Sequence, residues 1–151
     1  MKVKYQLVIN CVGHPETLAR FWADALGYVL EPPPVDFVDW DDWRRSVGLP
    51  DSWLGRGTDS IIDPDGAGPR IWIQVVPERK TTSNRLHIDI HASGGRNLPI
   101  ATRKQRVDAE ALRLCGLGAT LLSDLSEELV NGVDHYAVAL TDPEGNEFDI
   151  N

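Results

Sequence analysis

Two stretches decide the fold: FWADALGY at residues 21–28 and RLCGLGAT at residues 113–120. In each, apolar residues at helical spacing lead into a leucine and a glycine, Leu26-Gly27 and Leu117-Gly118. Glycine directly after the last apolar residue is typical of a helix C-terminus, because it adopts the left-handed backbone conformation without strain. We therefore predict helices over residues 15–26 and 103–117, each followed by a strand.

The same order of elements surrounds both helices: strand, helix, Leu-Gly stop, strand, strand, Asp-Pro-acid-Gly turn, strand. The turns are residues 63–66 and 142–145. The expected strands are residues 3–10, 28–31, 60–62, 71–76, 86–92, 119–122, 135–141 and 146–150, and the alternation is strictest in 86–92. This pattern predicts an α+β fold in which two βαβββ modules form a curved mixed sheet with a central cleft. One domain covers residues 1–151, with modules at 1–78 and 86–151. Residues 35–57 are an insertion rich in acids and aromatics, in which we expect at most one short helix.

Composition narrows the function classes. The 151 residues are 42% hydrophobic and 25% charged, so the chain can bury one ordinary core. A formal charge of −8 repels phosphate backbones and anionic lipids, and no apolar run has the ~20 residues that a bilayer requires. Cys11 and Cys115 have no metal or disulfide spacing, and we expect buried free thiols. We expect a soluble cytoplasmic protein that binds a small ligand and no nucleic acid, membrane or nucleotide cofactor.

The repeat pairs polar residues of the two modules. Gln6 corresponds to His87 near the start of the first strand of each module, and Gln74 corresponds to Asp149 near the end of the last. All four have the strand parity that points away from the helix-covered face. Curved sheets would then bring Gln6, Gln74, His87 and Asp149 into one concavity.

The sequence resembles the vicinal oxygen chelate superfamily, and within it the glyoxalase-like domains of bacteria. The resemblance is carried by residues 21–28, 76–78, 84–87 and 142–148, and it covers nearly the whole chain except 35–57. It implies paired βαβββ modules, commonly a homodimer, and in many members a divalent metal held by one residue from each of four strands. Those four places fall on Gln6, Gln74, His87 and Asp149. Two neutral amides are weak donors, so Mg, Mn or Fe(II) suits the set better than Zn, with Ni also in the predicted group.

His87 and Asp149 are the candidate catalytic residues. His87 is a metal ligand or a general base, because imidazole exchanges protons near neutral pH, and Asp149 completes the metal site or accepts a proton. The alternatives are a cavity histidine that is hydrogen-bonded to Gln6 or Asp89, and a structural carboxylate at a sheet edge.

Further residues are candidates for substrate binding. They share the cleft-facing parity or lie in the insertion, and they are Trp72, Asp89, His91, Asn10, Trp40 and Trp43. Indole faces and carboxylates attract cationic or aromatic groups, so the tryptophans of the insertion form a lid in this interpretation. The alternatives are core packing or subunit contact for the tryptophans, and exposed positions for His91 and His135.

Two functions remain open at this point. The first is a glyoxalase-like enzyme, a lyase, isomerase or dioxygenase, acting on a carbonyl, enediolate or diol substrate through a cleft metal. The second is a metal-free protein that sequesters a cationic or aromatic compound, as bleomycin-resistance members of the superfamily do. The charge of −8, the five tryptophans and the two amides favour the second.

Overall fold

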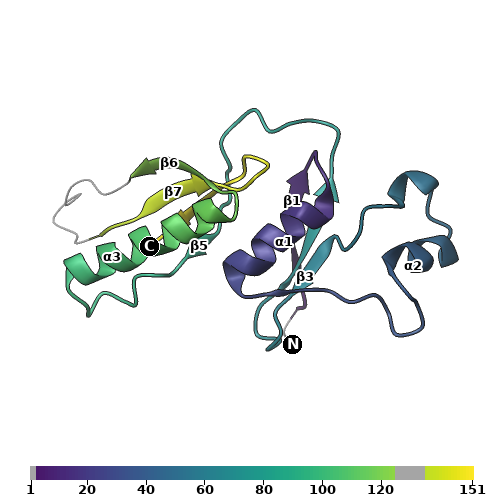
Figure 1. Cartoon of the computed structure of the whole chain (residues 1–151), viewed down its shortest axis with the longest axis horizontal. Helices are drawn as coiled ribbons and strands as arrows, with labels where there is room; N and C mark the ends of the chain where they lie inside the picture. The colour runs from purple at the N-terminus through teal and green to yellow at the C-terminus, as the bar shows by residue number, and fades with distance from the viewer. Residues whose placement is uncertain (1–2, 125–134) are drawn as a thin grey trace. The chain divides into compact units, whose positions relative to one another are not determined.

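A computed structural model describes residues 3–124 and 135–151. The chain divides into two compact units, Met1–Arg79 and Lys80–Asn151. Each unit contains a four-stranded mixed sheet with one long helix on it, which confirms the α+β class (Figure 1). None of the helices among the described residues is long and apolar enough to span a bilayer.

The first unit orders its strands β1-β4-β3-β2. Its elements are β1 (Gln6–Cys11), α1 (Pro15–Leu26), β2 (Val29–Leu30), α2 (Trp40–Ser46), the 3-10 turn η1 (Asp51–Trp53), β3 (Ser60–Ile62) and β4 (Arg70–Val75). Strand β1 runs parallel to β4, whereas β3 is antiparallel to both β4 and β2. The predicted hairpin of β3 and β4 is confirmed.

Helix α1 forms where the apolar spacing predicts it. Leu18, Phe21 and Trp22 are buried on its inner face, and Ile61 and Ile73 are buried in the sheet beneath it. The helix ends at Leu26 because Gly27 takes the left-handed conformation, with φ of 71°.

The second unit repeats this plan with the strand order β5-β8-β7-β6. Its elements are β5 (Asp89–Ile90), α3 (Ile100–Gly116), β6 (Thr120–Asp124), β7 (Val138–Thr141) and β8 (Glu147–Ile150). Strand β5 is parallel to β8, and β7 is antiparallel to both β8 and β6. Val107 and Leu114 of α3 are buried, as are Leu140, Phe148 and Ile150 of the sheet.

Several predicted boundaries are wrong. The strand expected at 86–92 pairs as a strand only at Asp89–Ile90, since it is an edge strand with one neighbour and Leu86 is 79% exposed. Strand β1 begins at Gln6 rather than at residue 3, because Val3 and Tyr5 remain exposed. Helix α3 begins at Ile100, directly after Pro99, rather than at 103. Cys11 is buried as expected, but Cys115 is only half-buried.

A buried arginine anchors the insertion to the first unit. The Arg44 side chain of α2 is only 2% exposed. Its Nη1 donates to Asp41 Oδ1 at 2.8 Å, and its Nη2 donates to the Gly57 carbonyl at 2.9 Å and to Asp59 Oδ2 at 3.2 Å. The Asp41 contact lies within α2, whereas the Gly57 and Asp59 contacts tie α2 to the segment that leads into β3, so the insertion has a defined place on this unit.

Glu16 joins the first turn of α1 to the same region. Its Oε2 accepts a hydrogen bond from the Thr58 backbone at 2.9 Å, and its Oε1 accepts from Arg20 Nε at 3.0 Å. Gly57 is required beside it, since φ is +62° and a Cβ there would lie 1.7 Å from Glu16 Oε2. The Thr58 hydrogen bond, followed by the Arg20 guanidinium, lowers the pKa of Glu16 below its ordinary value of 4.5.

Replacing Glu16 by glutamine should therefore lower stability in a pH-dependent way. A lowered pKa in the folded state stabilises the protein above the unfolded value of 4.5, and that stabilisation is lost as pH falls through the folded value. We expect Glu16→Gln to cost about 1 kcal/mol at pH 7, with the loss shrinking in acid. Urea unfolding across this range measures it, with exposed Glu78→Gln as the control. An equal loss at every pH would contradict the electrostatic origin.

Candidate functional site

The strand registers give the correspondence between the two units. Val29 pairs with Ile62 in the first unit, and Thr120 pairs with Thr141 in the second, each two residues after its Leu-Gly stop. Continuing through each hairpin, Ser60 pairs with Trp72, and Ala139 pairs with Asp149. Trp72 therefore corresponds to Asp149.

This register corrects one inferred equivalence. Across the parallel pairs, Trp72 lies opposite Val8, and Asp149 lies opposite Asp89. Gln6 consequently corresponds to His87, as predicted, but Gln74 does not correspond to Asp149. The turn of the first hairpin is longer than that of the second by two residues rather than four, which moves the equivalent position from Gln74 to Trp72.

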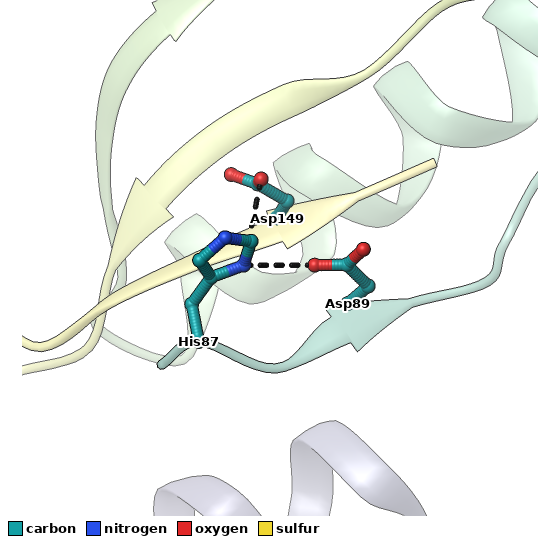
Figure 2. Close-up of side chains that lie close together, drawn as sticks. All are labelled: His87, Asp89 and Asp149. Carbon is teal, nitrogen blue, oxygen red and sulfur yellow. Dashed lines mark hydrogen bonds and ion pairs between the residues drawn. The ribbon is translucent and has the colours of Figure 1, made fainter. Parts of the chain in front are cut away.

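The second unit gathers an imidazole and two carboxylates on the face of its sheet opposite α3, here called the open face (Figure 2). His87 Nδ1 lies 2.9 Å from Asp89 Oδ1 and 3.7 Å from Asp149 Oδ2. The three side chains each offer one ligand atom within 4.8 Å of the others. They meet because Asp89 and Asp149 are opposite each other on adjacent strands, and His87 precedes Asp89 with the same parity.

The carboxyl of Asp149 lies in a partly buried environment. Burial raises the pKa of its carboxyl, the neighbouring Asp89 raises it further, and His87 and His135 oppose the shift. No N–H or O–H group in the described part of the chain donates a hydrogen bond to its carboxylate, although Phe148 and Ile150 on either side are fully buried. Asp149 therefore favours a proton or a cation as its partner.

A chain of polar contacts continues from Asp89 along the open face. Asn151 Nδ2 lies 3.5 Å from Asp89 Oδ2, and Asn151 Oδ1 lies 2.6 Å from His91 Nδ1. Asn151 was missed by the sequence reasoning, although it has the same strand parity as Asp149 and that parity would have found it. His91 is exposed, and exposed His135 is close enough to Asp149 to influence its ionisation.

In the first unit, Val8 and Trp72 stand at the positions of Asp89 and Asp149, and a cation, Arg70, lies opposite Gln6. Gln6 Oε1 accepts a hydrogen bond from Arg70 Nη1 at 2.8 Å. Arg70 also pairs with Glu31 at 2.6 Å and donates to Ser60 Oγ at 2.6 Å. The oxygen that Gln6 would offer to a metal therefore already has a donor.

The remaining predicted residues are dispersed over the first unit. Gln6 lies opposite Arg70 and Gln74 lies opposite Asn10, so the two glutamines are four residues apart, ~13 Å along the strands. Trp40 and Trp43 make an edge-to-face pair at 5.5 Å, and Trp40 Nε1 donates to the Glu31 carbonyl at 2.9 Å. The four-residue metal set and the tryptophan lid stay predictions, because the structure describes the two units separately.

Two βαβββ units, one carrying a histidine and carboxylates on its open face, define a protein of the glyoxalase-like class. The family model described as the glyoxalase-like domain matches residues 6–151, so the chain belongs to that family. No curated protein matches the sequence.

Solved structures agree on the fold. A glyoxalase/bleomycin resistance protein/dioxygenase family enzyme from Burkholderia phytofirmans PsJN has a TM-score of 0.56 at 16% identity, covering 97% of this chain and 94% of that one. A mutant of the fosfomycin resistance protein FosX from Listeria monocytogenes, complexed with Mn(II) and 1S,2S-dihydroxypropylphosphonic acid, has a TM-score of 0.57 at 11% identity, covering 100% and 90%. The hypothetical protein SA1046 from S. aureus scores 0.57 at 14% identity, covering 99% and 93%.

Proposed function

We propose that this protein is a small-molecule enzyme acting on a carbonyl, enediolate or diol substrate with the help of a divalent metal ion. The observation that carries the proposal is the convergence of His87, Asp89 and Asp149 within 4.8 Å on the open face of the second sheet. In this proposal His87 and Asp149 hold the ion. Gln6 and Gln74 complete the four predicted metal ligands. Gln6 would be a weak ligand, because its side-chain oxygen already accepts a hydrogen bond from Arg70.

The donor set fits a hard divalent ion. One imidazole nitrogen and carboxylate oxygens suit Mg, Mn or Fe(II), and Ni and Zn also accept this mixture. Asp149 supports the fit, because burial disfavours its charge and no described group donates a hydrogen bond to it. When bound, the ion would act as a Lewis acid on a substrate oxygen.

The protein's own contribution is proton transfer and placement. Burial raises the pKa of the Asp149 carboxyl, which makes it a stronger base than an ordinary aspartate. When Asp149 does not bind the ion, it is therefore suited to removing a proton next to a substrate carbonyl. His87 is suited to the same role. Trp72, His91 and Asn10 are proposed to contact substrate, with Trp40 and Trp43 over it.

The neighbours support the class of ligand and ion. The FosX mutant was crystallised with Mn(II), a hard ion, and with a dihydroxy phosphonic acid, a diol. The proposal includes lyase or dioxygenase chemistry and a cytoplasmic location. It also includes a homodimer, as the resemblance to the superfamily implies.

Metal binding tests the proposal directly. We expect about one divalent ion per chain after reconstitution, and we expect His87→Ala to lose it while the circular dichroism spectrum is retained. Elemental analysis and calorimetric titration with Mn²⁺ measure both, with His14→Ala in the first unit as the matched control. Full occupancy in His87→Ala would place the ion elsewhere.

A protein that binds no ion would support the second function, sequestration of a cationic or aromatic compound. Trp72 favours this function, because a half-buried indole stands at the position that corresponds to Asp149. Ligand quenching of tryptophan fluorescence that depends on Trp72, with no product formed, would establish it.

A further inference from the structure

Asp89 differs from Asp149 in how it meets His87. The contact between His87 Nδ1 and Asp89 Oδ1 is 2.9 Å, a hydrogen bond, whereas Asp149 Oδ2 is 3.7 Å from the same nitrogen, too far for one. A neutral imidazole carries one N–H, and an ionised carboxylate accepts but never donates. For a neutral ring beside an ionised Asp89, this contact requires the proton on Nδ1.

The second oxygen of Asp89 is held from the other side. Asn151 Nδ2 approaches Asp89 Oδ2 at 3.5 Å, a long contact. With its amide nitrogen turned toward Asp89, Asn151 points its oxygen at His91 Nδ1, at 2.6 Å. The directions agree throughout, since His91 donates to Asn151, Asn151 donates to Asp89, and His87 donates to Asp89 from the opposite end.

We infer that Asp89 is a positioning residue: through its hydrogen bond to Nδ1 it fixes the ring of His87 in the Nδ1–H tautomer and leaves Nε2 as the lone-pair atom that faces a ligand. Asn151, which contacts His91, makes a longer contact with the other oxygen of Asp89. Nothing in the family match or in the neighbours assigns these three residues. The functional consequence rests on the proposed function, whereas the tautomer does not.

In this arrangement Asp89 orients His87, and Asp149 binds the ion or a proton. A carboxylate that orients a histidine typically changes metal affinity by about 10–100-fold when it is removed, less than the loss of a ligand. Asp149, which accepts no hydrogen bond from the described residues, remains available to the ion or to a proton. A single histidine can therefore be both oriented and left with one free nitrogen.

The tautomer is measured on the metal-free protein. Two-bond ¹H–¹⁵N spectra distinguish protonated from unprotonated ring nitrogens. They are recorded at a pH well above the reference pKa of free imidazole, about 6.5, so that the neutral ring dominates. We expect His87 in the parent protein to carry its proton on Nδ1. Asp89→Ala should lose that preference, whereas Asp149→Ala should keep it. A parent protein with the proton on Nε2 would overturn the inference, even if a variant failed to fold.

Metal titration separates this inference from the proposed function. We expect Mn²⁺ affinity to fall by about 10–100-fold in Asp89→Ala and much further in Asp149→Ala. Equal losses would make Asp89 a ligand rather than a positioning residue. If the parent protein bound no metal, the proposed function would fail, and the tautomer measurement would still decide the role of Asp89.

Discussion

Replacing Arg44 by alanine should lower the free energy of unfolding by about 3–5 kcal/mol. Arg44 is 2% exposed, and its guanidinium reaches Asp41, the Gly57 carbonyl and Asp59 within 3.2 Å. Removing the cation leaves the half-buried Asp41 and the buried Asp59 without their common partner, and a buried charge that has lost its partner is far more costly than an exposed one.

The matched control is the next residue. Arg45 is exposed on the same helix, so we expect Arg45→Ala to change stability by less than about 0.5 kcal/mol. Urea unfolding followed by tryptophan fluorescence measures both variants, and it reports on the insertion itself because Trp40 and Trp43 lie in α2. Equal stability of the two variants would show that Arg44 does not anchor the insertion.

The elements that the sequence predicted well are those with two independent signals. Helix α1 has an apolar stripe and a glycine stop, and both of its ends are confirmed at Pro15 and Leu26. The strand at 86–92 had only its alternation. Alternation shows which side chains share a face, but it does not show how many neighbours a strand has, and β5 is an edge strand paired only with β8.

The number of independent signals also explains which site residues were predicted correctly. Parity and the repeat placed His87 and Asp149 together, and the structure brings them within 3.7 Å in the second unit. Counting residues from the Asp-Pro turn suggested Gln74 as the counterpart of Asp149, whereas the register gives Trp72. The count fails because the sequence does not show how many of the additional residues belong to the loop and how many to the strand. The contact of Arg70 with Gln6 depends on the same register, so the sequence did not predict it either.

In the proposed metal site, Asp149→Asn should weaken Mn²⁺ binding strongly, and at the same time it should stabilise the fold at neutral pH. Asparagine keeps the shape of the side chain but removes the charge, so we expect Mn²⁺ affinity to fall by more than the roughly 100-fold upper cost of losing an orienting residue. Burial is the main cause of the raised pKa of Asp149, which means that ionisation costs more in the folded than in the unfolded chain.

The sign of the stability change follows from that shift. A carboxyl whose pKa is raised on folding adds stability only below its unfolded value of 3.8, and that contribution is lost as pH rises through the folded value. The variant should therefore match the parent near pH 4 and become the more stable protein toward pH 7. Urea midpoints of the metal-free proteins test this, with exposed Asp36→Asn as the control. A variant that is less stable than the parent at pH 7 would mean that Asp149 serves the fold, whereas a stabilised variant without metal would mark a carboxylate retained for function at a cost in stability.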